Sequence, residues 1–280
     1  HQYMLFFTQK GKCFWMRVYE IPEGSKNSKG RAIQNLINIE QDDRVKAFIC
    51  TQDLKDEDYV NSNYVIMATK MGQVKKTSLE QYSRPRSNGI NAITVKDGDE
   101  LLEAKLTNGN SQIMLAVQSG KAIRFEESKT RPMGRNASGV RGIRLKDSKD
   151  EVVGMISVND MDANILVVSE NGYGKRSSLE DYRLTNRGGK GVKTISITEK
   201  TGKLVTLKSV SDNDDLMIIN KSGIAIRMQV EDLRVMGRAT QGVKVISLKD
   251  GDSIAAVAKV MKDDDDIEDI NEIEYTGDTV

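Results

Sequence analysis

The residue types that perform most enzyme chemistry are scarce in this sequence of 280 residues. The only histidine is His1, and the two cysteines, Cys13 and Cys50, are far apart, so His/Cys metal clusters and Ser-His-Asp triads are excluded. Carboxylates concentrate in turns and near the C-terminus, where we expect them to be solvated. Gly172-x-Gly174 is too short for a dinucleotide fingerprint, and no Gly-Lys pair precedes Ser or Thr as in a P-loop. We therefore expect no catalysis, metal or cofactor in this chain.

Cations beside glycines offer a different chemistry, which is the binding of a polyanion. Residues 186–191 read Asn-Arg-Gly-Gly-Lys-Gly. Gly188 and Gly189 would let backbone N–H groups approach phosphate oxygens, while Arg187 and Lys190 supply positive charge. A simple glycine-rich turn is the alternative interpretation.

Five internal repeats supply the elements that must position these cations. Each repeat opens with an apolar run, such as YMLFFT from Tyr3 or YVIMAT from Tyr64, followed by a glycine turn and a second strand. A polar loop, a short Gly-(Val/Ile)-x-x-Ile strand and an acidic turn lead to a fourth strand, for example residues 45–49 or 254–260. The first repeat has only a looser third strand, residues 30–33. The boundaries are about 1–61, 62–111, 112–163, 164–213 and 214–261.

Four short strands per repeat of about fifty residues, with no sustained 3.6-residue period, predict an all-β propeller-type fold. A single four-stranded unit exposes both faces of its sheet, so neighbouring units must stack to bury them. Strands that radiate from one centre would bring equivalent loops to the same rim.

Basic residues recur in the second strand and in the loop after it. The basic residue four positions after the turn glycine is present in four repeats, and Trp15 stands in its place in the first. A recurring placement favours a DNA-binding rim, whereas a single charged loop would favour solvation alone. Further loop cations are Lys26, Lys29, Arg31, Arg144 and Lys244. The predicted DNA contacts are Arg187, Lys190, Gly188, Gly189, Lys175, Arg176, Arg183, Lys193, Arg124, Arg131, Arg135, Arg141, Lys75, Lys76, Arg84, Arg86, Arg227, Arg234 and Arg238.

The net charge of +1 conceals two segments of opposite sign. Of 42 basic and 41 acidic residues, residues 262–280 hold one and nine, which leaves about +9 on residues 1–261 and about −8 on the tail. We expect this tail to be disordered, and two roles for it stay open. It could mimic a polyanion and compete for the basic rim, or it could act only as a solubilising end.

Composition also bears on the compartment. No run approaches the roughly 18 apolar residues that span a bilayer, and no secretory signal opens the chain. Cys13 and Cys50 lie in strand-like apolar runs, so we expect reduced, buried thiols. The chain starts in a strand-like run without a methionine, so we expect it to be part of a longer cytoplasmic protein.

Three segments resemble one known family, the C-terminal β-pinwheel domain of the DNA gyrase A subunit. They are RPMGRNASGVRGIRL from Arg131, ENGYGKRSSLEDY from Glu170 and VMGRATQGV from Val235, and the resemblance extends to about Val260. It implies a propeller-like β-pinwheel with five of the usual six blades. The blade missing at the front is the one that carries the gyrase A box, a Gln-Arg-Arg-Gly-Gly-Lys-Gly-like loop, and residues 186–191 resemble a degenerate second copy of it.

The resemblance implies that the domain wraps duplex DNA without sequence specificity and so supports ATP-dependent negative supercoiling by a type II topoisomerase. The catalytic tyrosine, ATP and Mg²⁺ sites of that enzyme would lie outside this chain. Implied partners are duplex DNA, the gyrase B subunit, and a second gyrase A chain, with no membrane. The implied location is the cytoplasm, associated with the nucleoid, and the fragment alone would be monomeric.

Two alternatives remain open. The C-terminal domain of the topoisomerase IV A subunit is related but usually has fewer, less regular blades and a degraded box, so five regular repeats and an Arg-Gly-Gly-Lys-Gly loop favour gyrase. A protein-binding propeller would need aromatic anchors, whereas 5% of the residues are aromatic, and the Trp-Asp signature is absent.

Overall fold

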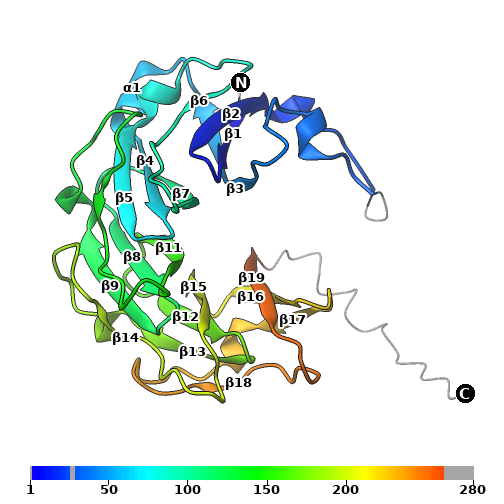
Figure 1. Ribbon diagram of the computed structural model, residues 1–280, viewed down its shortest axis with the longest axis vertical. Coiled ribbons are helices and arrows are strands. Elements are labelled where there is room, and N and C mark those ends of the chain that lie inside the picture. Colours follow the sequence, from blue (N-terminus) through cyan, green and yellow to red (C-terminus); the bar gives the residue numbers. More distant parts are fainter. Residues whose placement is uncertain (1, 26–28, 262–280) are drawn as a thin grey trace, which may run out of the picture.

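Five small antiparallel sheets follow one another along an open arc (Figure 1). This computed structural model describes residues 2–25 and 29–261. Two predictions lie outside the described residues. They are the loop cation Lys26 and the disordered acidic tail, residues 262–280. The one α-helix of the described residues is the short α1 (Glu57–Ser62), so the all-β prediction is confirmed. The two ends of the arc, β1 to β3 and β16 to β19, face each other across its opening.

Each repeat contributes three long strands to its own sheet. In chain order these are β1 (Gln2–Thr8), β2 (Lys12–Arg17) and β3 (Val45–Asp53); β4 (Tyr64–Thr69), β5 (Gln73–Ser78) and β7 (Leu101–Thr107); β8 (Gln112–Val117), β9 (Lys121–Glu126) and β11 (Val152–Val158); β12 (Asn164–Ser169), β13 (Tyr173–Ser178) and β15 (Leu204–Val210); β16 (Asp214–Asn220), β17 (Ala225–Gln229) and β19 (Ile254–Met261). The first strand of each repeat is central, with the second strand on its outer side and the last on its inner side.

The fourth strand of each of the first four sheets comes from the following repeat. These short strands are β6 (Ile90–Asn91), β10 (Val140–Arg141), β14 (Val192–Lys193) and β18 (Val243–Lys244), which pair with β2, β5, β9 and β13 respectively. We call each sheet with its exchanged strand a blade. The expectation of self-contained four-stranded units is wrong on this point, because each repeat covers the outer edge of its predecessor's sheet.

Because each repeat passes its short strand to the preceding sheet, the two ends of the arc differ from the middle. The fifth sheet has three strands, and within the described residues no further strand pairs with β17. The looser third strand expected at residues 30–33 is not formed. A 3₁₀ helix, Ile33–Asn35, follows there, and Ile33, Ile37 and Ile39 pack on the first sheet beside Phe6 and Phe14.

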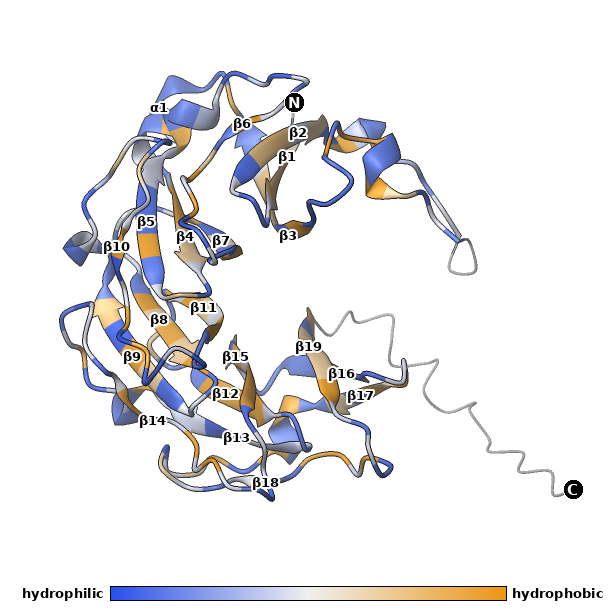
Figure 2. Ribbon diagram, in the orientation of Figure 1, coloured by the Kyte–Doolittle hydropathy of each residue, from blue (hydrophilic) through white to orange (hydrophobic). Residues whose placement is uncertain are grey.

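Continuous apolar runs form the central strands because those strands are buried on both faces. Along β4, Val65 and Met67 join the hydrophobic cluster shared with the first blade, while Ile66 and Ala68 join the cluster shared with the third. An alternating polar pattern would suit a strand with one solvated face, whereas a strand sandwiched between two sheets needs both faces apolar. Figure 2 shows these hydrophobic central strands between more hydrophilic loops.

Acidic turns hold the glycine turns of their own repeats. Gly72 has φ +86°, and a Cβ there would lie 2.8 Å from the carbonyl oxygen of Ile143. Asp99 accepts a hydrogen bond from the Met71 N–H at 2.9 Å, and Asp150 accepts from Ser119 N–H at 3.0 Å. The expectation that turn carboxylates are simply solvated is therefore wrong for Asp150, which is buried.

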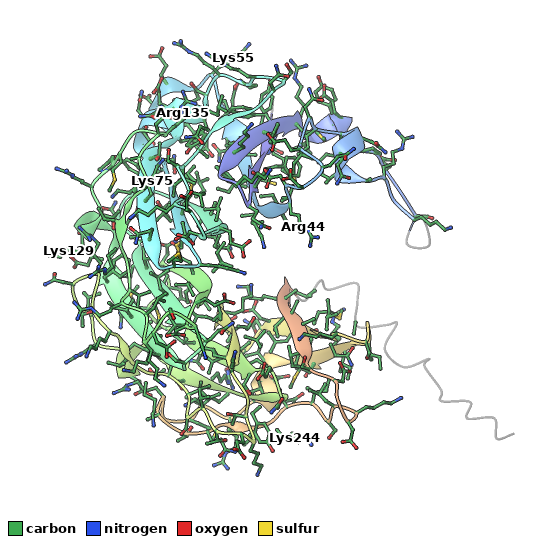
Figure 3. The ribbon with its side chains drawn as sticks, in the orientation of Figure 1. Arg44, Lys55, Lys75, Lys129, Arg135 and Lys244 are labelled. Carbon is green, nitrogen blue, oxygen red and sulfur yellow. The ribbon has the colours of Figure 1, made fainter. Side chains whose placement is uncertain are left out.

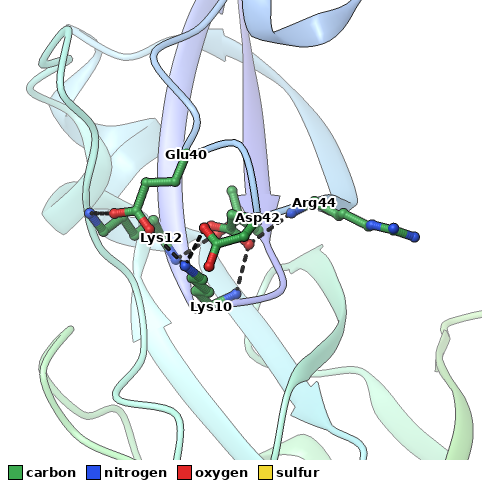
Figure 4. A network of polar contacts seen from close by, with 7 residues as sticks. Lys10, Lys12, Glu40, Asp42 and Arg44 are labelled. Carbon is green, nitrogen blue, oxygen red and sulfur yellow. Dashed lines mark hydrogen bonds and ion pairs between the residues drawn. The ribbon is translucent and has the colours of Figure 1, made fainter.

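Exposed ion pairs surround the equivalent glycine turn of the first repeat, at Gly11 (Figure 4). The Lys10 ammonium lies 2.8 Å from Glu40 and 2.6 Å from Asp42, and Lys12 lies 3.3 Å from Glu40. Their hydrogen bonds lower the pKa of both carboxyl groups. Such exposed pairs contribute little to stability, so the acidic turn is consistent with a local structural role.

The cysteine expectation holds for one of the two residues. Both are free thiols; Cys13 is buried, which raises the pKa of its thiol, whereas Cys50 is exposed on β3. Alternation along β3 explains the difference, because Ile49 and Thr51 face inward on either side of Cys50.

Candidate nucleic-acid interface

Loops from the second to fifth repeats run along the outer edge of the arc (Figure 1). The loops of the third, fourth and fifth repeats each begin with a short parallel bridge to the preceding repeat. Each of these loops then continues into the exchanged strand that pairs with the preceding repeat's sheet. The bridges join Lys76 to Pro132, Arg124 to Leu184 and Arg176 to Val235. Backbone N–H groups of Met133, Thr185 and Met236 donate at 2.7–2.9 Å to the carbonyl oxygens of Lys76, Arg124 and Arg176.

Successive loops are joined to one another by backbone hydrogen bonds. Thr94 N–H donates to Ala137 at 3.3 Å, Arg144 N–H to Gly189 at 2.8 Å, and Ser196 N–H to Thr240 at 3.1 Å. We call the linked loops 83–89, 131–139, 183–191 and 234–242, with the exchanged strands that follow them, the perimeter belt. Its continuity places the loop cations along one edge of the molecule, as the repeat pattern predicted.

Three equivalent arginines connect the belt to the preceding repeat. Arg187 donates to the carbonyl oxygens of Lys129 and Arg141, both at 3.0 Å, and Arg238 donates to those of Asp181 and Lys193, both at 2.8 Å. Arg135 makes a longer contact of 3.4 Å to the carbonyl oxygen of Asn91. These half-buried guanidinium groups therefore hold the belt together as well as carrying charge.

Glycines of the 186–191 loop serve packing more than anion binding. Gly188 N–H donates to the carbonyl oxygen of Gly142 at 2.6 Å, so it is not free for a phosphate. Gly191 has φ +70°, and a Cβ there would lie 2.5 Å from the carbonyl oxygen of Ala122. Beside this loop is an open hollow of about 410 Å³, which Arg144, Arg183 and Lys190 line.

Most of the remaining belt cations are exposed and lie on the outer side of the arc. Figure 3 shows Lys129 and Lys244 there, whereas Arg44 points toward the inside of the arc. The 3₁₀ helices before the loops of the second, fourth and fifth repeats carry exposed acids, such as Glu80 and Glu180. In the third repeat the only helix acid, Glu127, is buried and Lys129 is exposed. The exposed belt cations are Arg84, Arg86, Arg131, Arg141, Arg183, Lys190, Lys193, Arg234 and Lys244, and the exposed Arg144 lies just beyond the exchanged strand β10.

Second-strand cations do not belong to this exposed surface, which corrects the prediction for them. Lys75, Lys76, Lys175 and Arg176 are buried, and Arg124 is half-buried. Arg227, also half-buried, donates to the Asp215 carboxylate at 2.7 Å within its own sheet. The following repeat contacts the four buried side chains and Arg124, and contacts between blades are not visible in the pattern of a single repeat.

Four of the second strands carry a donor that reaches the 3₁₀ helix of the next repeat. Lys76 donates to the Glu127 carbonyl oxygen at 3.3 Å, and Arg176 donates to the Leu233 carbonyl oxygen at 2.5 Å. We call Trp15, Lys76, Arg124 and Arg176 the inter-repeat donors. Trp15 takes this role with its indole N–H, so the position that lacks a cation in the sequence is not an exception in the structure.

Lys75 and Lys175, one residue earlier in their strands, hold the arginine-bearing turns of the belt. Lys75 Nζ donates to the carbonyl oxygens of Ala92 at 2.5 Å and Arg135 at 2.6 Å. Lys175 Nζ donates to the Gly237 carbonyl oxygen at 2.7 Å and also contacts that of Arg238. Burial, with a smaller contribution from Arg135, lowers the pKa of Lys75 to about 7, and burial lowers the pKa of Lys175 to about 8.

Sequence reasoning missed two features of this surface. It gave no role to Lys129, which lies on the outer side and accepts the Arg187 hydrogen bond through its carbonyl group. It also missed the donor function of Trp15, although the four-residue offset from Gly11 that Trp15 shares with the cations was a usable signal.

Metal ligands do not cluster in the described part of the chain. Across those residues, no three or more His, Cys, Asp or Glu side chains gather to hold a metal ion. None of the helices among residues 2–25 and 29–261 has the length and apolar character needed to cross a membrane.

Comparisons with known proteins agree with this geometry. A family model described as the DNA gyrase C-terminal domain, a β-propeller, matches residues 2–52, 63–108, 112–159, 163–211 and 214–261. The DNA gyrase A subunit of Staphylococcus aureus (strain NCTC 8325) is 44% identical over 282 residues, which cover all of this chain and 31% of that protein. The chain thus spans less than a third of the length of this relative.

Two solved structures share the fold. The crystal structure of the C-terminal domain of DNA topoisomerase IV superposes with a TM-score of 0.83 at 26% identity, covering 93% of this chain and 79% of that one. The structure of the DNA gyrase A C-terminal domain gives a TM-score of 0.79 at 25% identity, covering 93% and 83%.

The exchanged strands and the cationic perimeter belt define a β-pinwheel, a propeller whose repeats cover one another's outer edges. The chain belongs to the DNA gyrase C-terminal domain family.

Proposed function

We propose that this domain binds duplex DNA along the perimeter belt without reading its sequence and bends the duplex around the arc. The observation that carries the proposal is the continuity of the belt: nine exposed cations lie on loops and exchanged strands that are hydrogen-bonded from repeat to repeat. Cations that neutralise phosphates release counterions, and this favours binding to any duplex sequence.

Bending requires contacts at more than one point. Curving 20 to 30 base pairs by 40 to 90° costs on the order of 1–6 kcal/mol, so a single basic patch would leave the duplex straight. A belt that follows a convex edge can offset that cost because each further contact requires the duplex to curve.

We further propose that the chain works as the C-terminal domain of a DNA gyrase A subunit, where it supports ATP-dependent negative supercoiling by the holoenzyme. In this proposal the catalytic tyrosine, ATP and Mg²⁺ belong to other parts of the assembly, and the partners are the gyrase B subunit with a second gyrase A chain. The chain itself has no catalytic role, is monomeric as a fragment, and acts in the cytoplasm at the nucleoid. The 44% identity to the S. aureus gyrase protein supports gyrase over topoisomerase IV, although the fold resembles both.

A binding and bending measurement tests the DNA proposal. We expect affinity for a linear duplex to fall at least about 10³-fold between 50 and 200 mM salt, as for six or more phosphate contacts. Fluorescence transfer between dyes on the two duplex ends should rise as the protein binds. A flat salt dependence, or binding without a change in transfer, would refute the proposal.

Two triple variants with equal charge loss locate the contact surface. One replaces Lys190, Lys193 and Lys244 of the belt with Gln. The other replaces Lys46, Lys105 and Lys259, which lie on the inner strands β3, β7 and β19, where each is 3.7 Å from a carboxylate. We expect the first variant to weaken binding and flatten the salt dependence, and the second to bind almost as the wild type does.

A further inference from the structure

An exposed arginine followed by an exposed apolar residue opens every loop of the perimeter belt. In the fourth and fifth repeats the apolar residues are Leu184 and Val235, whose exposed fractions are 44% and 55%. Pro132 holds the same position in the third repeat, and Pro85 also follows an arginine in the loop of the second repeat. The four pairs are Arg84-Pro85, Arg131-Pro132, Arg183-Leu184 and Arg234-Val235, and all eight residues are exposed.

The backbone holds three of these apolar residues rigidly at equivalent places. Pro132, Leu184 and Val235 are the residues that form the parallel bridges to the preceding repeat. The next residue in each case donates a backbone hydrogen bond to that repeat and is half-buried. The apolar side chain thus points outward from a fixed backbone, so little conformational entropy is lost when it contacts a ligand.

Isolated exposed apolar residues are common and need no explanation, and Met71 and Met161 are examples in this molecule. Recurrence at one register beside an arginine is different, because a polar residue at these exposed positions would leave the bridge and its hydrogen bonds intact. Figure 2 shows hydrophobic stretches along the outer loop near β18, among hydrophilic residues. The recurrence therefore indicates a contact outside the molecule.

The chemistry of the pair matches one surface of curved DNA. A duplex that bends around a protein turns its minor groove inward at regular intervals, and proteins that bend DNA place arginines and apolar side chains there. Contact with the phosphates alone would require only the arginine of each pair. An adjoining aliphatic or proline side chain is suited to the deoxyribose edges that line the minor groove.

We propose that these four arginine–apolar pairs contact the minor groove of the bound duplex, with the apolar side chain against the sugar edges. This inference rests on the proposed DNA binding and deepens it. It adds a contact that does not depend on salt and that favours bending, because the pairs on successive loops reach successive inward-facing grooves only on a curved duplex.

The test is the double variant Leu184→Ser, Val235→Ser, measured by DNA titration over a range of salt. Because no counterion is released by the apolar contact, affinity should fall about three- to tenfold at every salt concentration with an unchanged salt slope. Energy transfer between the duplex ends should also fall. The control double variant Phe48→Ser, Met71→Ser removes exposed apolar groups outside the belt and should behave as the wild type does.

Prefilling the minor groove of an A·T-rich duplex with netropsin tests which groove is used. The ligand should weaken wild-type binding more than it weakens the Leu184→Ser, Val235→Ser variant, which has already lost the contact. Equal loss in both proteins, or a variant that binds and bends as the wild type does, would overturn the inference while leaving the proposed DNA binding intact. A wild-type protein that does not bind DNA would overturn both.

Discussion

The indole Nε1–H of Trp15 donates to the carbonyl oxygen of Tyr82 at 2.9 Å, and Arg124 makes the same contact to Tyr182 at 2.9 Å two repeats later. One residue is neutral and the other is charged, yet both join a second strand to the 3₁₀ helix of the next repeat. The position therefore requires a donor of the right length, and charge is secondary there.

Loss of this donor should loosen the contact between the first two blades. Trp15→Phe keeps most of the ring but leaves the Tyr82 carbonyl group without its indole partner, so we expect a destabilisation of about 1–3 kcal/mol. Urea unfolding measures it. Met71→Ala, an exposed change of apolar side chain, is the control and should have no comparable effect; equal stability of Trp15→Phe and wild type would contradict the inter-repeat role.

Lys75 should make stability depend on pH above neutrality. Its pKa is about 7 in the folded protein, below the ordinary value of 10.5 that the unfolded chain regains. Between these values the unfolded state binds more protons, so the free energy of unfolding should rise with pH, by at most about 1.4 kcal/mol per pH unit from this group. Below pH 7 the contribution is constant.

Lys75→Met is the matching variant for that pH dependence. Urea unfolding at several pH values between 7 and 9 should show a shallower rise for the variant than for the wild type. Lys175 remains in both proteins, so its own lowered pKa cancels in the comparison. Identical slopes in the two proteins would mean that Lys75 does not change its protonation in this range.

Gly191 should not tolerate a side chain. A Cβ would lie 2.5 Å from the carbonyl oxygen of Ala122, on backbone that already has a φ of +70°. We expect Gly191→Ala to lower the free energy of unfolding by about 1–3 kcal/mol and to displace the 183–191 loop. Gly237→Ala, in the equivalent loop with no atom within 4 Å, is the control and should be nearly neutral.

Charge and geometry can be separated within the 186–191 loop. Lys190 is exposed, so Lys190→Ala should reduce the magnitude of the salt slope by up to about 0.9 and leave unfolding unchanged. Arg187→Lys retains the charge but loses the planar guanidinium that bonds Lys129 and Arg141, so it should preserve the slope and lower thermal stability. A stability loss in Lys190→Ala, or a smaller salt slope with unchanged stability in Arg187→Lys, would contradict the contacts described.

Removal of residues 262–280 tests the two roles of the acidic tail. The segment carries about −8 against about +9 on the rest of the chain, so a competing tail should weaken DNA binding most strongly at low salt. Deletion after Met261 is then expected to tighten binding at low salt and to have less effect at high salt. Unchanged binding would support the solubilising role.

The sequence alone determined the repeats, the all-β class, the glycine turns and the cations of the perimeter loops. These are local properties: apolar runs, turn glycines and charged loops show in the order of residues. Lys190 and Arg183, which were predicted as DNA contacts, are exposed and line one hollow, and their contact with DNA stays a prediction.

Only the tertiary structure decided that the fourth strand of the first four sheets belongs to the next repeat. The same non-local exchange decided that Lys75, Lys76, Lys175 and Arg176 lie between repeats. A basic residue in a strand is compatible with a solvated face or with a buried one that meets carbonyl groups, and the choice depends on which chain segment covers it. That segment lies 51 to 62 residues away in the sequence, beyond the reach of any local pattern.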